Sequence, residues 1–179
     1  KNGYKIYNTS YLSEKTIINI FLLRLNKKLQ PKSFTEIQVK TFSDNSKNND
    51  FKIKYNKEKK QTIIVGELFD AEPLLKSFYK TKDRKTFSKD FSTELKVNFD
   101  KAITGSNDDV SNFSMIASIK KGSYSKLSLK GNFSENEIVE MSIYQNDNEK
   151  KTLQVISDRA RPFIKNFDFI EGFEGGKLE

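Results

Sequence analysis

Apolar and polar residues alternate along several stretches of this chain, and the alternation limits what the chain can fold into. From Phe91 to Asp100 the apolar residues occupy the odd positions and the polar residues the even positions. Because successive side chains of a β-strand point to opposite faces, such a stretch forms a strand with one apolar and one polar face. The same pattern recurs at Phe113, Met115, Ala117 and Ile119, at Leu127 and Leu129, at Val139, Met141 and Ile143, and at Leu153 and Val155.

Turn-forming residues separate these stretches. The predicted turns and polar loops are Ser43–Asp50, Asn107–Asp109, Gly122, Gly131-Asn132, Asn136 and Asn146–Asn148. Antiparallel sheets tolerate short connections and water on one face. The sequence therefore predicts a mainly β fold, an antiparallel meander or curved sheet with a one-sided apolar groove and two short α-helices.

The first third of the chain fits two kinds of element. The apolar run from Ile17 to Leu25 suits either a helix capped by Ser13 or a strand buried on both faces. The β-branched pair Ile17-Ile18 and the asparagines at 19 and 26 favour a strand. These residues leave the choice between strand and helix open for residues 14–29.

Two segments, Thr62–Phe78 and Thr152–Phe167, repeat nearly the same pattern. Each has a strand-like run, then an aspartate, a proline and apolar residues at the i, i+3, i+4, i+7 spacing of a helix. Asp70 and Asp158 are the predicted N-caps of these helices. We expect the helices to cover part of the apolar face with Leu74, Leu75 and Phe78 in the first and Phe163, Ile164 and Phe167 in the second.

The spacing of these segments, roughly 90 residues, exceeds the common solenoid repeats and indicates a module of several strands ending in a helix. We expect an excerpt of a larger repeated β protein. Its modules would cover about 1–80 and about 86–172, with the start of a next strand at 173–179.

The composition argues against most catalytic chemistry. The chain has no cysteine or histidine, which excludes disulfides, zinc–cysteine clusters, cysteine nucleophiles and histidine-based triads. Its paired carboxylates, such as Asp108-Asp109, fall in predicted turns, and no phosphate-binding glycine loop or metalloprotease motif occurs. We expect no enzymatic activity, no cofactor and no metal.

The formal net charge of +8 comes from lysines spread over polar strand faces and turns. This distribution is more typical of a solvated surface than of a stripe that follows phosphates, so no nucleic-acid partner is expected. Each lysine near an anionic membrane surface would still contribute about 1 kcal/mol of attraction.

The apolar face has two interpretations. The simpler one is an ordinary core, with the face packed against a second layer. The other is an open groove for hydrocarbon, since moving a sixteen-carbon acyl chain through water costs about 13 kcal/mol at ~0.8 kcal/mol per CH₂.

The two repeated segments also carry a resemblance to a known family. Phe69-Asp70-Ala71-Glu72-Pro73-Leu74-Leu75, the later Ser157–Phe167 segment and the closing Gly175-Gly176-Lys177-Leu178 resemble the AsmA-like C-terminal region family. This family occurs in large bacterial envelope proteins of the YhdP and TamB kind, and its alphaproteobacterial versions are the most similar. The resemblance covers roughly residues 50–179 and suggests that Thr16–Phe42 is strand.

What the resemblance implies is a segment of a periplasmic, inner-membrane-anchored, bridge-like protein that moves phospholipid along a hydrophobic groove between inner and outer membranes. The expected partners are phospholipid acyl chains, the inner membrane, the outer membrane and other envelope proteins. The alternation supplies the expected groove-lining residues, which are Phe91, Leu95, Val97, Phe99, Phe113, Met115, Ile119, Leu127, Leu129, Val139, Met141, Ile143, Leu153 and Val155. The alternative is a non-catalytic structural or interaction module with a closed core.

Overall fold

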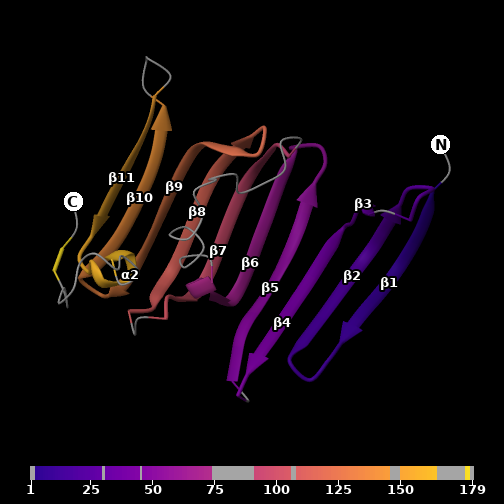
Figure 1. The fold of residues 1–179 in the computed structure, drawn as a ribbon, viewed down its shortest axis with the longest axis horizontal. Coiled ribbons are helices and arrows are strands. Elements are labelled where there is room, and N and C mark those ends of the chain that lie inside the picture. The colour runs from indigo at the N-terminus through magenta and orange to yellow at the C-terminus, as the bar shows by residue number, and fades with distance from the viewer. Residues whose placement is uncertain are drawn as a thin grey trace.

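The computed structural model describes residues 3–29, 31–44, 46–73, 91–105, 108–145, 150–164 and 176–177. These residues form one open sheet of 11 strands, in the order β1-β2-β4-β5-β6-β7-β8-β9-β10-β11, with β3 paired to β2. Figure 1 shows the strands side by side in a single twisted layer, with β1 and β11 at its two edges. The predicted mainly β fold is confirmed.

The strands are long and alternate in direction along most of the sheet. Their bounds are β1 Tyr4–Leu12, β2 Thr16–Leu25, β3 Pro31–Ser33, β4 Glu36–Ser43, β5 Ser46–Asn56, β6 Gln61–Asp70, β7 Thr93–Ile103, β8 Val110–Lys120, β9 Ser123–Ser134, β10 Glu137–Gln145 and β11 Lys151–Ser157. The short helix α2 spans Arg161–Ile164. It lies beside the end of the sheet where β11 finishes (Figure 1).

One strand pair departs from the predicted antiparallel meander. Strands β6 and β7 pair in parallel, from Gln61 opposite Glu94 to Asp70 opposite Ile103, whereas every other pair is antiparallel. A parallel pair needs a crossover of a dozen or more residues, and the stretch 71–92 between these strands is long enough. The β6–β7 pair is therefore a seam between two antiparallel meanders, β1–β6 and β7–β11.

Residues 16–25 form strand β2 rather than a helix. Ile18 and Ile20 pair with Val39 and Ile37 of β4, and the other edge of β2 pairs with β1. The β-branched side chains fit the pleated surface between two neighbours, which is why the strand prevails over the helical spacing.

Two turn predictions are corrected by the structure. The predicted loop Ser43–Asp50 is reduced to a tight turn at Asp44, because β5 begins at Ser46 and its polar side chains find cross-strand partners. Asn49 donates from Nδ2 to Thr41 Oγ1 at 2.8 Å and accepts the Asp70 N–H at 2.9 Å. Gly131-Asn132 lies inside β9, where the missing side chain of Gly131 lets Val110 and the Ser111 backbone approach.

Other turn predictions are confirmed. Gly122 sits between β8 and β9 with a φ of 76°, a conformation that glycine adopts without strain. Asn136 lies in the β9–β10 turn, and Asp108-Asp109 lies between β7 and β8. The cluster Asn146–Asn148 lies outside the described residues.

The buried core lies in the second meander. Its larger cluster contains Leu95, Val97, Phe99, Ala117, Ile119 and Leu127. A smaller cluster contains Ala102, Val110 and Val139, with Phe113, Phe133 and Phe163 packed against it.

Candidate functional site

The candidate site is an apolar row that crosses the sheet at right angles to the strands. Paired residues of neighbouring strands point to the same face, so the register shows which side chains adjoin one another. One line of paired residues contains Thr9, Ile20, Ile37, Ile53, Ile64, Val97, Met115, Leu129, Met141 and Val155. We call this line the apolar row. It takes one residue from every strand on the path from β1 to β11, without a break at the parallel seam.

The apolar row is half-buried over nearly its whole length. Val97 is 5% exposed, whereas every other member is neither fully buried nor fully exposed. At about 4.8 Å per strand, the row extends about 43 Å from edge to edge. It is a continuous apolar surface that other molecules can partly reach.

The predicted groove residues lie on this same face, except for Phe91. Phe91 precedes β7, is 38% exposed and accepts the Gly122 N–H at 2.9 Å through its carbonyl oxygen. The half-buried members are Phe113, Met115, Leu129, Met141, Ile143 and Val155, and Leu153 is 59% exposed on the edge strand β11.

Part of the predicted groove is closed. The buried members are Leu95, Val97, Phe99, Ile119, Leu127 and Val139. A groove-lining residue must be reachable from outside, and these side chains instead pack into the two core clusters. These six residues therefore lie on the predicted face but are covered in this structure, because alternation identifies the face of a side chain and not what covers it.

An aromatic cluster spans the seam on the apolar face. The Phe99 ring stacks on Phe69 at 4.9 Å between centroids and meets Phe51 edge-on at 5.9 Å. Gly66 lies between Phe51 and Phe99 in the register, so the two rings meet over a position without a side chain. These contacts tie β5 and β6 to β7 where the only parallel pair among the described strands lies.

The opposite face carries most of the charged and polar strand residues, although Ile63, Val65, Ile116 and Ile156 also lie on it. Residues paired across it include Gln38 with Lys52, and Asn98 with Ser114. Ion pairs cross it as well, with Lys54 Nζ 3.0 Å from Glu36 Oε2 and Lys40 Nζ 3.2 Å from Asp50 Oδ2. The hydrogen bond from Gln38 helps to hold the pKa of Glu36 below its ordinary value.

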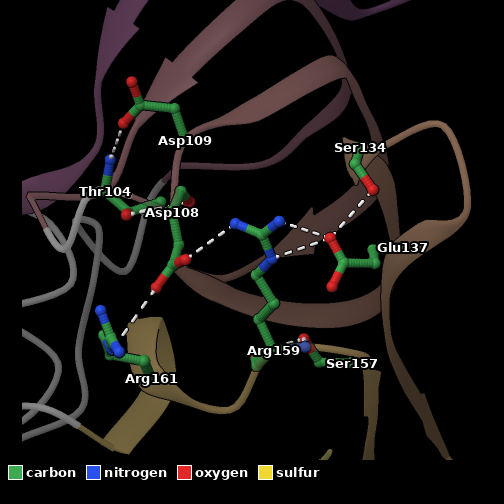
Figure 2. Close-up of polar contacts among 8 residues, drawn as sticks. All are labelled: Thr104, Asp108, Asp109, Ser134, Glu137, Ser157, Arg159 and Arg161. Atoms are coloured by element: carbon green, nitrogen blue, oxygen red, sulfur yellow. Dashed lines mark hydrogen bonds and ion pairs between the residues drawn. The ribbon is translucent and has the colours of Figure 1, made fainter. Parts of the chain in front are cut away.

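A charged cluster closes one end of the second meander (Figure 2). Arg159 donates from Nη1 to Asp108 Oδ1 at 2.9 Å and from Nε to Glu137 Oε2 at 3.1 Å, and its Nη2 also contacts Glu137. Its guanidinium lies 5.4 Å from the Phe133 ring centroid, a cation–π distance. Arg159 thus joins the β7–β8 turn, the start of β10 and the segment before α2.

The ion pairs of this charged cluster shift the pKa values of its members. The hydrogen bond from Arg159 lowers the pKa of Glu137, and the bonds to Glu137 and Asp108 raise the pKa of Arg159. A hollow of about 260 Å³ adjoins these residues, and its lining also includes Asp158, Ala160, Arg161 and Gly176. Charge-assisted hydrogen bonds between the carboxylates and the guanidinium of Arg159 hold these segments together.

The predicted helix caps have different outcomes. Asp70 accepts the Glu72 N–H at 3.1 Å, the bond expected of a cap, where helical residues 72–73 begin. Asp158 does not cap α2, which begins at Arg161. Its carboxylate instead accepts the Ile138 N–H at 2.9 Å and pairs with Lys177 Nζ at 2.6 Å, and the bond from Lys177 lowers its pKa.

The expected helix seal is only partly visible. Phe163 of α2 packs on the smaller core cluster, which covers that end of the apolar face. Ile164 ends α2, but its side chain is outside the described part. Leu74, Leu75, Phe78 and Phe167 lie outside the described residues.

Sequence reasoning missed two parts of the site. The first-meander members of the apolar row, Ile20, Ile37, Ile53 and Ile64, were not among the predicted lining residues. The alternation of Glu36-Ile37-Gln38-Val39-Lys40 could have identified them. Arg159 was the other omission, and no local pattern marks a residue whose partners lie 22 and 51 positions away.

Neither a membrane-spanning helix nor a metal cluster was found in the described ranges. No helix there is long and apolar enough to cross a membrane. No group of three or more acidic side chains there is placed to hold a metal ion.

Comparisons with known proteins add no relative. No protein-family model matches the chain, and neither a curated protein nor a solved structure does.

Proposed function

We propose that this chain carries phospholipid acyl chains along the apolar face of its sheet, as a segment of a bridge-like lipid-transport protein in the bacterial periplasm. The observation that carries the proposal is the apolar row, which takes one residue from each strand on the path from β1 to β11 and is half-buried at every member except Val97, the buried member beside the seam.

The energetics of lipid transfer favour such a row. An acyl chain gains about 0.8 kcal/mol for each CH₂ removed from water, so any gap in the lining raises the barrier to movement. The row offers an apolar residue on every strand from β2 to β11, with the γ-methyl of Thr9 on β1. The mechanism is passive, with acyl chains on the apolar face and headgroups in water.

The open edges of the sheet support a place within a longer structure. Strands β1 and β11 each have a strand partner on one side only in the described sheet. Tyr7 and Tyr11 on β1 are 71% and 59% exposed, and Leu153 on β11 is 59% exposed. Further strands added at either edge would extend the apolar row in the direction that a lipid must travel.

Photo-crosslinking tests this proposal. A photoreactive side chain at Ile37, Ile53 or Met141, which belong to the apolar row, should capture phospholipid from detergent-free vesicles. The same group at Lys52 or Lys96, on the polar face, should not. Adducts on both faces in equal yield, or none on the apolar row, would contradict acyl-chain binding.

A second function is favoured by the burial of the second meander. Leu95, Phe99, Ala117 and Ile119 are at most 7% exposed, which is the packing of a closed structural or interaction module. If the whole chain is such a closed module, no photoreactive probe on the apolar row should capture lipid. If lipid transport is correct, probes at Ile37 and Ile53 capture it and a probe at Leu95 does not.

A further inference from the structure

The exposed lysines of this protein gather at one end of the strands. Because the strands alternate in direction, the turns after β2, β5 and β8 and the start of β11 all lie at the same end of the sheet. We call this end the basic rim. Its lysines, all exposed, are Lys27, Lys28, Lys57, Lys59, Lys60, Lys120, Lys121, Lys150 and Lys151. Glu58 is the one carboxylate within these turns among the described residues.

The opposite end of the sheet carries charges of both signs. Its turns and strand ends carry Asp44, Asp70, Glu72, Asp108, Asp109, Glu135, Glu137 and Asp158, and the cations Lys101, Arg159, Arg161 and Lys177 pair with four of these carboxylates. Strands of 7 to 12 residues separate the two ends by about 25–40 Å, at least about three times the Debye length of ~8 Å at physiological salt. The carboxylates therefore do not cancel the field at the basic rim.

The basic rim also exposes apolar and aromatic side chains. Leu29 is 65% exposed in the turn after β2, and Tyr4 is 58% exposed at the adjoining start of β1. Tyr144, opposite Thr152 near the start of β11, is 46% exposed. Lysines that flank exposed tyrosine and leucine are typical of surfaces that rest in the interface of a bilayer.

The geometry points to the basic rim as a docking surface for a bilayer that contains anionic phospholipids. The lysines lie against the headgroup phosphates, Leu29, Tyr4 and Tyr144 enter the interface, and the opposite end of the strands faces away from the membrane. The apolar row then lies parallel to the membrane plane, so a segment docked in this way would carry acyl chains along the surface of that membrane. The inference does not depend on acyl-chain transport, because it uses only the rim.

The membrane explains the rim better than a nucleic acid does. Both partners would attract the lysines, and both would lose affinity with salt. Only a bilayer offers an apolar region in which the exposed Leu29 gains free energy by leaving water.

Vesicle flotation of the full chain tests the inference. Vesicles of equal parts phosphatidylcholine and phosphatidylglycerol should carry the protein upward at low salt, whereas phosphatidylcholine vesicles should not. The rim variant Lys57→Glu/Lys59→Glu/Lys120→Glu should bind at least about 100-fold more weakly, since each lysine at an anionic surface contributes about a five-fold change in affinity.

A matched control separates the rim from the total charge. Lys52→Glu/Lys96→Glu/Lys130→Glu changes the net charge equally, but these exposed lysines lie on the polar face away from the strand ends. It should retain vesicle binding within about five-fold of the wild type. Equal losses in the two variants, or binding to single-stranded RNA with no binding to vesicles, would overturn the proposed docking surface.

The two proposals can fail separately. The rim variant should still form lipid adducts at Ile37 in detergent micelles, where no anionic surface is needed. A chain that floats with anionic vesicles but forms no adduct contradicts only the acyl-chain proposal. A chain that forms adducts but never floats contradicts only the basic rim.

Discussion

The two meanders share one apolar row but bury it differently. In the first meander, β1–β6, no described side chain is fully buried, and Ile20, Ile37, Ile53 and Ile64 all remain half-buried. In the second, β7–β11, Leu95, Val97, Phe99 and Ile119 lie at 7% exposure or less. The same alternating pattern thus makes an accessible surface in one region and a closed core in the other.

This difference teaches that the role of an apolar face depends on what lies over it. A single sheet buries one face only when another layer covers it. In the second meander Phe163 of α2 supplies part of that cover, and Arg159 fastens the preceding segment to the β7–β8 turn and the start of β10. The second meander is therefore the stable part from which the more open first meander extends.

The largest expected effect compares matched isoleucines in the two meanders. Ile119 in β8 is 2% exposed, so Ile119→Ala should lower the free energy of unfolding by about 2–5 kcal/mol. Ile37 in β4 is half-buried, and Ile37→Ala should cost about half as much or less, because less apolar area returns to water. Urea unfolding of both variants measures the difference. Equal losses would show that the first meander is as tightly packed as the second.

The next effect concerns the seam that joins the meanders. A Cβ on Gly66 would come within 2.7 Å of the Phe51 Cα, and the nearby Asp50 carbonyl is backbone that cannot swing away. Gly66→Ala should therefore destabilise the protein by about 1–3 kcal/mol through overpacking. Val65→Ala, on the opposite face of the same strand, is the control and should change stability by about 0.5 kcal/mol or less.

Thermal unfolding that monitors each meander separately sharpens the seam prediction. If Gly66→Ala uncouples the two meanders, the single transition of the wild type should split into two. A single transition at an unchanged midpoint would mean that the aromatic contacts across the seam tolerate the added methyl group.

Much of this fold follows from the sequence, for local reasons. The alternation of β7 appears directly in its burial, in which Leu95, Val97 and Phe99 are buried and Glu94 and Lys96 are exposed. The parallel β6–β7 pair could not be predicted this way, because strand order depends on the path of the chain between strands. The same limit applies to Asp158, whose partners Ile138 and Lys177 are distant in sequence.

The sequence predicts which face of the sheet carries the candidate site, but it does not predict which side chains on that face are accessible. Period-two alternation placed Met115, Leu129 and Met141 correctly on one face of the sheet. Whether a residue on that face is exposed or buried depends on tertiary packing. Val97 is buried and Ile37 is half-buried, although both lie in the apolar row.

A smaller effect compares the charged groups of the two meanders. Arg159→Ala leaves Asp108, which is 8% exposed, with only the longer ion pair to Arg161 at 3.9 Å and should cost about 1 kcal/mol. Lys47 in the first meander bridges Asp50 and Glu67 on an exposed face, so Lys47→Ala should leave stability nearly unchanged. Arg159→Lys should restore only part of the loss, since a point-like ammonium lacks the planar fork with which the guanidinium contacts Glu137 through two nitrogens and Asp108 through the third. Urea unfolding measures both losses in the free energy of unfolding. A larger loss for Lys47→Ala than for Arg159→Ala would contradict the greater importance of the charged groups of the second meander.

The two smallest expected effects are pH dependences, and the larger of them lies in the second meander. The hydrogen bond from Arg159 lowers the pKa of Glu137 from its ordinary value of 4.5. A carboxylate with a depressed pKa stabilises the folded state above its unfolded-state pKa, and this contribution is lost as the pH falls through the folded-state pKa. The unfolding midpoint of the wild type should therefore decrease below about pH 4.5, and that of Glu137→Gln should decrease less.

Asp50 provides the matched test in the first meander. Burial there favours the neutral acid, but the hydrogen bonds from Lys47 and Lys40 outweigh it and leave the pKa of Asp50 lowered. Asp50→Asn should therefore also reduce the loss of stability at acid pH. We expect a smaller reduction than for Glu137→Gln, because burial of Asp50 opposes the effect of the two lysines. Thermal unfolding of both variants between neutral and acidic pH measures the two contributions. If Asp50→Asn flattens the acid dependence more than Glu137→Gln does, charge pairing matters more in the open meander than in the closed one.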